Sequence, residues 1–466
     1  MTEPQVSTTT KIGYGVSELG TMATEIMIRL YLLIFYTDLV GLSPNLAGYA
    51  VAIAIIWDAV TDPVMGVISD HTRTRWGKRR PYILTGALFL SISLVFLFSK
   101  PMVSSQGGMF LYLLLSYIMV NTCMTVVTVP HFALGREVTF DPNERTEVYG
   151  WRLLFGNIGF LAGTLLPGLF LISASGSPDT ATAAGAHNHA AIVVGILIVF
   201  ASSFTFLTTR DIDRSTAITA VSGFMNLLRF IVSAFNNRAF LPLFLAYSTA
   251  MIGLSLNSSF SLYYYRYRLH LEEAGIQMTL GTFIVFFSLS LYIWVLVSRK
   301  YGKRIPAFLA SLALGIIITI AYPFLPPGRL EPVVALAVIN GVLVGSIVLI
   351  ESLVADTVDF DELTCGNNRE GLYFGLWKMG TKMSRAVALA VTGNLLYMIG
   401  YIPNRIQTPA VERNIALIYG LGVGIFIIAG ALLLLFMPLT LERHRRIQAL
   451  LMKKRSRKNQ TRACPS

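Results

Sequence analysis

The sequence predicts an all-α membrane protein with twelve transmembrane helices, arranged as two six-helix halves in parallel orientation. Three observations support this prediction. The chain of 466 residues is 54% hydrophobic and 13% charged, with a mean hydropathy of +0.63, which is too apolar for a soluble domain. Twelve apolar runs are each long enough to cross a bilayer. Two short motifs also recur at nearly one spacing, which indicates an internal repeat.

The apolar runs follow one another with short polar connections, apart from one longer connection in the middle of the chain. A helix needs about 20 apolar residues to cross the hydrocarbon core. The runs cover residues 12–38, 45–69, 81–100, 108–134, 149–174, 188–208, 239–262, 277–298, 305–325, 332–355, 371–400 and 413–437. We expect one transmembrane helix from each run, with an N-terminal half at 1–208 and a C-terminal half at 239–437.

The basic residues of the connections are distributed unevenly between the two sides. An even number of crossings places both chain ends on one side of the membrane. The connections on that side hold most of the basic residues, beginning with the dense run at 73–80, whereas the opposite connections hold only Lys100, Arg266, Arg268, Arg329 and Arg405. Because cytoplasmic loops carry the excess of Lys and Arg, both termini are expected in the cytoplasm.

The two halves share short motifs in equivalent connections. Residues 75–81 (RWGKRRP) resemble residues 300–306 (KYGKRIP), and both segments follow the second run of a half. Residues 138–141 (VTFD) resemble residues 358–361 (VDFD), and both follow the fourth run. The offsets are 225 and 220 residues, and each motif keeps its side of the membrane. The halves are therefore predicted to be parallel repeats, which is the arrangement of major facilitator transporters.

A cytoplasmic linker is expected at 209–238 and a basic cytoplasmic tail at 438–466. Apolar residues at helical spacing in the linker predict a surface helix that lies on the membrane: Ile218, Val221, Phe224, Met225 and Leu228. The basic tail favours contact with anionic lipid. The net charge of +12 sits mainly in these loops and in the tail, so we expect a lipid bilayer and no nucleic acid as partner.

Several function classes are excluded by what the sequence lacks. The cysteines (Cys123, Cys365 and Cys464) have no disulfide or metal-ligand spacing. No phosphate-binding loop of the nucleotide-hydrolase type is present, and no nucleophile–base pair or metal cluster is found. We therefore expect no enzyme activity and no cofactor, and energy for any transport would come from a gradient of H⁺ or Na⁺.

Two acids stand in the second apolar run. Asp58 and Asp62 are four residues apart, so they share one face of a helix. A carboxylate at membrane depth costs about 2.5–3.5 kcal/mol or more unless it faces a cavity or a cation. The pair therefore predicts a cation site: either Na⁺ bound with hydroxyl ligands from Thr61, Thr125 or Thr128, or H⁺ carried by one acid. The alternative is a structural salt bridge to Arg152 or Lys382.

A charged network is expected at the cytoplasmic ends of the helices. Asp70 precedes a run of basic residues, and further arginines follow the fourth run. These residues are predicted to close the cytoplasmic side by pairing with one another: Asp70, Arg73, Arg75, Lys78, Arg136 and Arg145. The alternative is that they only set the topology of the chain.

The first apolar run carries a polar face. Glu18, Met22, Glu25 and Arg29 follow one another at steps of four, three and four residues, so they share one face that cannot point at lipid. Glu25 and Arg29 have the spacing of an ion pair. Two interpretations stay open: Glu25 and Arg29 contact a substrate, or they form a buried ion pair that fastens this helix to another one.

Basic residues also share a face in the eleventh run. Lys382 is predicted to face the N-terminal half, within reach of Asp58 or Asp62, because an unpaired ammonium at membrane depth is costly. The alternative is that Lys382 extends to the cytoplasmic interface without a partner. Arg385 is expected to make a polar packing contact outside the cavity. His131 is interpreted as a hydrogen-bonded packing residue, and residues 263–267 (YYYRY) as an interfacial aromatic belt.

Together these motifs resemble one known family. Residues 57–63 (WDAVTDP), 73–81 (RTRWGKRRP) and 355–360 (ADTVDF), followed by Arg369, Glu370, Gly371 and Lys382, resemble the glycoside–pentoside–hexuronide:cation symporters, the family of melibiose permease. The resemblance covers nearly the whole chain. It implies a major facilitator fold in the bacterial plasma membrane that moves a solute with Na⁺, Li⁺ or H⁺ by alternating access. It also implies cation residues at Asp58, Asp62 and Thr125, and substrate-side residues at Arg152 and Lys382.

The departures from the family pattern concern mainly the sugar site. The family acid of the first helix aligns with Met22, the acid of the fourth helix with Thr128, and the aromatic platform with Phe132. Thr61 stands in place of an asparagine, and Trp377 and Lys378 replace small polar groups. The resemblance thus implies that the cation site is mostly kept and the galactoside site mostly not. The missing acid slightly favours H⁺ over Na⁺.

The sequence therefore predicts a cation-coupled symporter of a small organic solute, with a sugar or glycoside as the first expectation. A lysolipid or another amphipathic solute is the alternative, and a membrane scaffold that transports nothing is a third interpretation. The expected substrate contacts are Glu25, Arg29, Arg152, Trp377, Lys378 and Lys382. We expect a monomer whose partners are the solute, the coupling cation and the bilayer.

Overall fold

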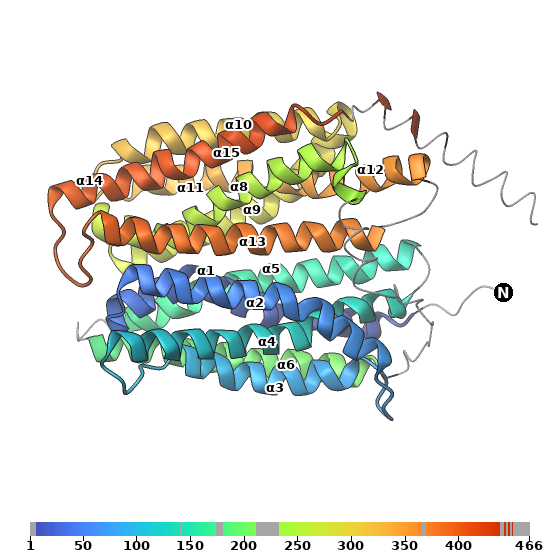
Figure 1. Ribbon diagram of the computed structural model, residues 1–466, viewed down its shortest axis with the longest axis horizontal. Coiled ribbons are helices and arrows are strands. Elements are labelled where there is room, and N and C mark those ends of the chain that lie inside the picture. Colours follow the sequence, from blue (N-terminus) through green and yellow to red (C-terminus); the bar gives the residue numbers. More distant parts are fainter. Residues whose placement is uncertain are drawn as a thin grey trace, which may run out of the picture.

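The computed structural model is a bundle of long helices that divides into two halves, drawn one above the other in Figure 1. It describes residues 6–139, 142–173, 180–210, 233–365 and 370–438, together with residues 442, 443, 446, 447 and 450. In these ranges the chain forms helices and no β-strand. The predicted all-α fold is confirmed.

Each of the predicted apolar runs is helical. The lower half in Figure 1 contains α1 (Thr8–Ile34), α2 (Pro44–His71), α3 (Arg80–Leu97), α4 (Gln106–Val138), α5 (Pro142–Ser173) and α6 (Thr180–Thr208). The upper half contains α8 (Phe240–Tyr263), α9 (Glu273–Tyr301), α10 (Arg304–Ala321), α11 (Glu331–Val344), α12 (Ile347–Cys365), α13 (Glu370–Met398), α14 (Pro409–Leu417) and α15 (Val423–Leu434). Short turns continue several of these helices: Phe35–Val40, Tyr264–Arg268, Tyr322–Phe324 and Ile418–Gly422.

Helix ends follow local sequence signals. The Ser7 hydroxyl accepts a hydrogen bond from the Thr10 amide at the start of α1, and Pro44 occupies the first turn of α2, where no intrahelical N–H is needed. Gly41 has a φ of 89° and ends the extension of α1. These signals place the acids of α1 and α2 at fixed depths in the bundle.

One predicted helix is broken. The tenth apolar run forms α11 and α12, which are separated at Gly345 and Ser346. Gly345 lies against α9 so closely that a side chain there would overlap the hydroxyl of Ser290. The break sets the position at which α12 enters the middle of the bundle.

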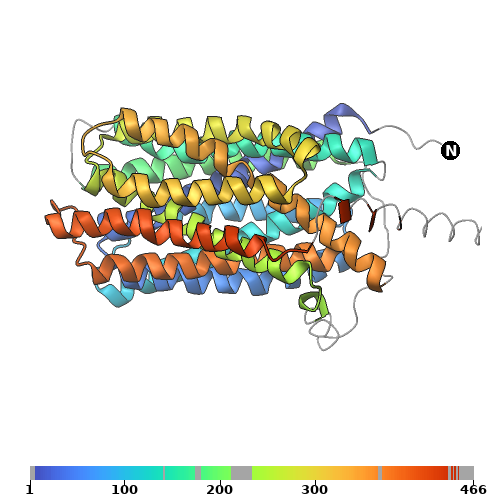
Figure 2. The ribbon, with the colours of Figure 1, turned by 90° about the horizontal axis from the view of Figure 1, so that it is seen from above.

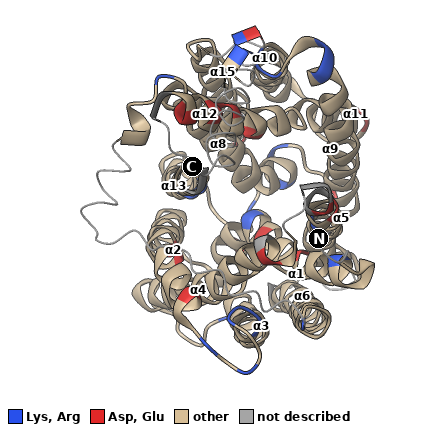
Figure 3. Cartoon of the chain, turned by 90° about the vertical axis from the view of Figure 1, so that its right-hand side faces the viewer, with Lys and Arg blue, Asp and Glu red and all other residues tan. Residues whose placement is uncertain are grey.

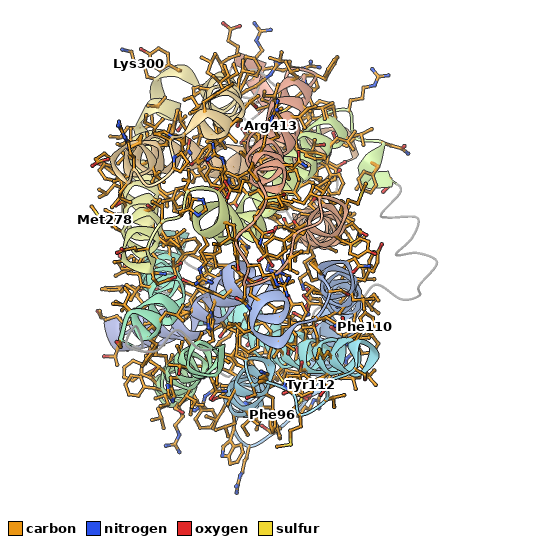
Figure 4. The ribbon with its side chains drawn as sticks, turned by 90° about the vertical axis from the view of Figure 1, so that its left-hand side faces the viewer. Phe96, Phe110, Tyr112, Met278, Lys300 and Arg413 are labelled. Atoms are coloured by element: carbon orange, nitrogen blue, oxygen red, sulfur yellow. The ribbon has the colours of Figure 1, made fainter. Side chains whose placement is uncertain are left out.

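The outer surface of the bundle suits a lipid environment. Eleven helical segments in the described part of the chain are long and apolar enough to span a membrane. The helix α13 is not among them, because it carries Lys378, Lys382 and Arg385 in its middle, but it runs the length of the bundle between α2 and α8. Phe96 and Met278, each 56% exposed, lie on the perimeter in Figure 4.

The internal repeat is visible in equivalent contacts. At the start of α3 the guanidinium of Arg80 donates to the carbonyl oxygen of Phe206 at the end of α6. At the start of α10 the guanidinium of Arg304 donates to the carbonyl oxygen of Leu435 at the end of α15. Helix α1 begins and α15 ends at one end of the bundle, at the right in Figures 1 and 2. We call this end the termini side and the other end the opposite side.

The halves are joined tightly at the opposite side. The Thr37 hydroxyl lies 2.8 Å from the Tyr263 hydroxyl, and the Tyr401 hydroxyl donates to Asp38 Oδ1 over 2.9 Å. Helices α2 and α13 meet at Gly48 and Gly393. A side chain at Gly393 would overlap the carbonyl oxygen of Pro44, and one at Gly48 would lie 2.8 Å from the carbonyl oxygen of Leu389.

The aromatic residues at the end of α8 belong to this closure. Tyr263, Tyr264 and Tyr265 are buried, and Tyr267 donates a hydrogen bond to the Asp38 carboxylate. The interpretation of residues 263–267 as an interfacial belt is wrong, because most of these rings pack inside the protein. The hydroxyls of Tyr263 and Tyr267 bond to Thr37 and Asp38 of the other half, whereas the Tyr264 hydroxyl donates to the carbonyl oxygen of Tyr322 in its own half.

The termini side has fewer hydrogen bonds and ion pairs between the halves in the part of the chain that the structure describes. Among the described residues, the hydrogen bonds and ion pairs that join the two halves lie at the opposite side or at mid-depth, where Lys382 and Arg385 contact α1, α2 and α4. The structure thus represents a conformation that is closed at the opposite side. The linker 209–238 and the tail 438–466 lie mostly outside the described residues, so their boundaries stay predictions.

Candidate cation and substrate site

A cavity of about 800 Å³ lies between the two halves. Helices α1, α2, α4 and α5 line one wall, and α8 to α13 line the other. Figure 3, viewed from the termini side, shows acidic residues on α1, α2 and α12 within this bundle of mostly uncharged helices. The charged side chains that line the cavity form several pairs, and each pair is described below.

The first group contains the predicted acid pair. The Nζ atom of Lys382 lies 2.7 Å from Asp58 Oδ2 and 2.5 Å from Asp62 Oδ2. The Thr125 hydroxyl on α4 lies 2.7 Å from Asp58 Oδ1 and 2.8 Å from Asp62 Oδ1. The predicted placement of Lys382 beside the acids is confirmed. The ammonium occupies the position between the carboxylates where a coupling cation would be held.

The other two predicted hydroxyl ligands behave differently. The Thr61 hydroxyl donates to the backbone carbonyl of Asp58 over 3.1 Å, and Thr61 is not among the residues that line the cavity. Thr128 does line the cavity, one helical turn from Thr125. Among the three hydroxyls, Thr125 contacts the acid pair, Thr128 lines the cavity but forms no hydrogen bond with either acid within the described residues, and Thr61 bonds to the backbone of its own helix α2.

A second pair joins α1 to α5. The guanidinium of Arg152 lies 3.0 Å from Glu18 Oε2 and is stacked over the Phe132 ring, with its central carbon 3.9 Å from the ring centroid. His131 lies beneath this pair: its Nε2 atom is 2.7 Å from the Tyr14 carbonyl oxygen, and its ring stacks on the Tyr14 ring. The interpretation of His131 as a hydrogen-bonded packing residue is confirmed. Arg152 takes Glu18 as partner, and not Asp58 or Asp62.

A third group connects α1 with α13. Arg29 Nη2 lies 2.8 Å from Glu25 Oε1, and Arg385 Nη1 lies 3.3 Å from the same oxygen. Arg385 also donates to the Tyr117 hydroxyl on α4 over 3.0 Å. The expectation that Arg385 lies outside the cavity is wrong, because this arginine lines it and contacts both α1 and α4. Glu25 lines the cavity, as the substrate-contact interpretation requires. It also pairs with Arg385 of α13, as the interpretation of a buried ion pair between helices requires.

The charge network at the termini side is built around Arg79, which was not among the residues predicted to form it. Arg79, which is 4% exposed, pairs with Asp70 and with Glu137, and it donates to the Ser69 hydroxyl over 2.6 Å. Burial raises the pKa of Glu137, and the charge of Arg79 opposes that shift. Within the described residues, Arg73, Arg75 and Lys78 form no ion pair with Asp70. The side chains of Arg136 and Arg145 lie outside the described residues.

The cavity extends beyond these charges into an apolar lobe in the C-terminal half. Leu280, Phe283 and Phe287 of α9 line it together with Leu314 and Ile318 of α10. At the border of the lobe, Trp377 of α13 stacks on Tyr247 of α8, with ring centroids 3.9 Å apart. We call this surface, lined by Leu280, Phe283, Phe287, Leu314 and Ile318, the apolar lobe.

Sequence reasoning missed one charged residue of the cavity. Glu351 of α12 lines it and lies inside a helical segment apolar enough to span a membrane. The signal was available, because an acid in an apolar run is the same signal that pointed to Asp58 and Asp62. Asp38, which is 4% exposed at the opposite side, was missed in the same way.

The site resembles binding sites for charged solutes and cations more than a metal centre. Within the described ranges, no group of three His, Cys, Asp or Glu side chains is placed to hold a metal ion. Carboxylate and hydroxyl oxygens do converge at Asp58, Asp62 and Thr125, which is the chemistry that a hard monovalent cation or a proton requires. The arrangement can bind a cation beside a solute cavity, with Lys382 as an internal competitor.

Comparison with known proteins gives consistent results. Residues 13–441 match the family model described as MFS/sugar transport protein. An uncharacterised symporter of Synechocystis is 28% identical over 93% of this chain and 94% of its own length. The isoprimeverose transporter of Lactiplantibacillus pentosus is 26% identical over 90% of this chain and 87% of its own length. In fold, the chain is similar to a bacterial homologue of the lysosomal transporter Spinster, with a TM-score of 0.66, 14% identity, and coverage of 97% and 99%.

Proposed function

The chain belongs to the MFS/sugar transport protein family, and from this premise we propose that it is a symporter that moves a small organic solute together with H⁺ or Na⁺ by alternating access. The family and the relatives named as symporters support cation-coupled transport. The proposal adds the cation site at Asp58, Asp62 and Thr125, and the solute site in the cavity.

One observation carries the mechanism: Lys382 of one half lies between two acids of the other half. The two carboxylates and the ammonium have a net charge of −1, so a monovalent cation is attracted to the group. When the cation binds, it neutralises the acids and weakens their attraction for Lys382. The ion pair that joins the halves at mid-depth is then released, and the halves can rock around the bound solute.

The solute is first proposed to be a sugar or glycoside, because the family model is described as MFS/sugar transport protein and one relative is named an isoprimeverose transporter. The charged side chains on both walls of the cavity support a hydroxyl-rich or charged ligand: Glu25, Arg29, Arg152, Lys378 and Lys382. The second candidate is an amphipathic solute such as a lysolipid. The apolar lobe favours this candidate, because a sugar alone leaves those aromatic and aliphatic side chains in contact with water.

The proposal is tested by uptake into proteoliposomes. A labelled glycoside or lysolipid is supplied outside, and a gradient of H⁺ or Na⁺ is imposed separately. The wild-type protein is expected to accumulate one of these solutes only under one of the gradients, and Asp62→Asn is expected to lose accumulation. Uptake by Asp62→Asn against a gradient would show that Asp62 is structural. No uptake of any solute under either gradient would favour a scaffold.

The membrane setting is part of the same proposal. The bacterial relatives support a multi-pass protein of the bacterial plasma membrane, and the charge distribution supports a cytoplasmic position for both termini. The functional unit is proposed to be a monomer. In the orientation with cytoplasmic termini, the side at which Asp38, Tyr263 and Tyr401 join the halves faces the outside of the cell. A cysteine-labelling test of this orientation is described in the Discussion.

A further inference from the structure

Two charged side chains of the cavity have no ion-pair partner among the residues that the structure describes. Among the described residues that line it, five are acidic and five are basic: Glu18, Glu25, Asp58, Asp62, Glu351, Arg29, Arg152, Lys378, Lys382 and Arg385. Eight of these pair with one another at the distances given above. Glu351 and Lys378 form no ion pair and no hydrogen bond with the described residues.

The ammonium of Lys378 contacts an aromatic ring and forms no ion pair with a described acid. Its Nζ atom lies 3.3 Å from the centroid of the Phe132 ring, and the same ring also carries the guanidinium of Arg152. Two positive charges thus share one ring, and among the described residues Arg152 forms an ion pair with Glu18 whereas Lys378 forms none. Met22 and Thr128, where the family resemblance led us to look for acids, contribute no carboxylate to this part of the cavity. An anionic group on a ligand would supply the missing charge.

Glu351 of α12 lies on the same wall of the cavity as Lys378 of α13. It lines the cavity together with Tyr247 of α8 and Trp377 of α13, whose rings stack on each other. The Nε1 atom of Trp377 is buried and has no hydrogen-bond partner, although Trp377 lines the cavity. A carboxylate next to stacked aromatic rings is an arrangement that favours a cationic group, such as a substituted ammonium.

Uncompensated charges inside a membrane protein are costly and are usually tied to function. A neutral sugar leaves both Glu351 and Lys378 without a partner. A purely anionic solute satisfies Lys378 alone, and a purely cationic solute satisfies Glu351 alone. A ligand with one charge of each sign satisfies both and leaves the net charge of the cavity unchanged.

We propose that the transported solute is a zwitterion whose anionic group binds Lys378 beside Phe132 and whose cationic group binds Glu351 beside Tyr247 and Trp377. The rest of the solute lies in the apolar lobe. This inference rests on the proposed transport function and names the chemical class of the solute.

The test uses four probes with one octyl chain and different head groups: octylphosphocholine (zwitterionic), octyl phosphate (anionic), octyltrimethylammonium (cationic) and octyl glucoside (neutral). Each is added below its micelle-forming concentration to the full-length protein in nanodiscs. Binding is measured as the increase in unfolding temperature and as a dissociation constant. Octylphosphocholine is expected to bind at least about tenfold more tightly than the other three probes.

Single charge removals separate the two contacts. Lys378→Gln is expected to weaken octylphosphocholine and octyl phosphate by about tenfold and to leave octyltrimethylammonium unchanged. Glu351→Gln is expected to weaken octylphosphocholine and octyltrimethylammonium and to leave octyl phosphate unchanged. Lys300→Gln and Glu331→Gln remove charges at exposed positions and serve as matched controls.

Three results would overturn the inference. In the first, octyl glucoside binds as tightly as octylphosphocholine. In the second, each variant weakens all four probes equally, as expected if Glu351 serves the coupling cation. In the third, the double variant recovers the affinity that the single variants lose, which would show that Glu351 and Lys378 pair with each other. Tight binding of octyl glucoside together with gradient-driven glycoside uptake would leave the proposed transport function intact.

Discussion

The ammonium of Lys382 lies 2.7 Å from Oδ2 of Asp58, so a basic residue of the C-terminal half occupies the acid pair of the N-terminal half. This contact joins the two repeats at mid-depth, between the closed opposite side and the termini side. If the proposed cation binds at these acids, its competition with Lys382 would link the occupancy of the site to the contact between the halves.

The first prediction concerns this competition. Lys382→Ala removes the internal positive charge and leaves two carboxylates, so the apparent affinity for the coupling cation is expected to rise by about tenfold while gradient-driven accumulation falls. The measurement is cation-dependent stabilisation and uptake in the same preparation. Lys300→Ala, at an exposed position, should change neither quantity. Additive losses for Lys382→Ala and Asp58→Asn in the double variant would show that the two residues are not coupled.

The second prediction concerns the orientation of the chain. The charge asymmetry of the connections predicts that the tail is cytoplasmic. In a variant that keeps Cys464 but lacks Cys123 and Cys365, a membrane-impermeant thiol reagent is expected to label the protein in inverted membrane vesicles and not in intact cells. Labelling of intact cells would contradict the assigned topology.

The third prediction concerns the buried arginine of the termini side. Arg79→Gln leaves Glu137 without its charged partner, and breaking a buried ion pair from one side typically costs about 3–5 kcal/mol. The unfolding temperature is expected to fall clearly, whereas Arg75→Gln, at an exposed position, should leave it nearly unchanged. Equal stability of the two variants would contradict a structural role for Arg79.

The pH dependence of this effect has a defined sign. Burial already raises the pKa of Glu137 in the folded protein, and loss of Arg79 removes the charge that opposes this shift. In Arg79→Gln the pKa of Glu137 is therefore expected to be higher in the folded than in the unfolded protein. Such a carboxyl group favours the folded state at low pH, where it is protonated, and this stabilisation is lost as the pH rises through the folded-state pKa. The stability deficit of Arg79→Gln should therefore be smaller in acidic buffer than in neutral or basic buffer.

Much of the fold was predictable because membrane helices have a strong signal. The apolar runs and the motifs at 75–81 and 300–306 located the helices and the repeat, and the helix-face argument located Glu25, Arg29 and Lys382. The partners of the basic residues were harder to predict. Arg79 and Arg80 are adjacent in sequence, yet the first pairs with acids at the ends of α2 and α4 and the second binds the end of α6. The spacing of residues along the sequence does not indicate which residues of different helices lie close together.

The remaining errors share a physical cause. Arg385 was assigned to polar packing outside the cavity, and the tyrosines at 263–265 were assigned to the membrane interface. Both assignments used only the residue type and its position in the chain. Their surroundings are set by the packing of α13 and α8 against the other half, which places Arg385 between Glu25 and Tyr117 and covers the tyrosine rings. Contacts between the halves depend on the conformation of the transporter, and a single sequence does not reveal them.

The fourth prediction concerns the close approach of α2 and α13 at the opposite side. A side chain at Gly393 would overlap the carbonyl oxygen of Pro44, and neither backbone can move away without separating the helices. Gly393→Val is therefore expected to destabilise the conformation that is closed at this side and to favour the alternative one. Gly375→Ala on the same helix is the matched control, because the space around Gly375 is open.

The change is measured by labelling a cavity residue from the opposite side. Thr279 lines the cavity and is 1% exposed, and Thr279→Cys in a background without other cysteines provides a nearly isosteric thiol there. An impermeant thiol reagent added from the side opposite the termini is expected to react several-fold faster in the Gly393→Val variant than in the Gly375→Ala variant. Equal rates would mean that the Gly48–Gly393 contact does not hold this side closed. Slower labelling in Gly393→Val would mean that the larger side chain locks the helices together, which is the reverse of the role assigned to this contact.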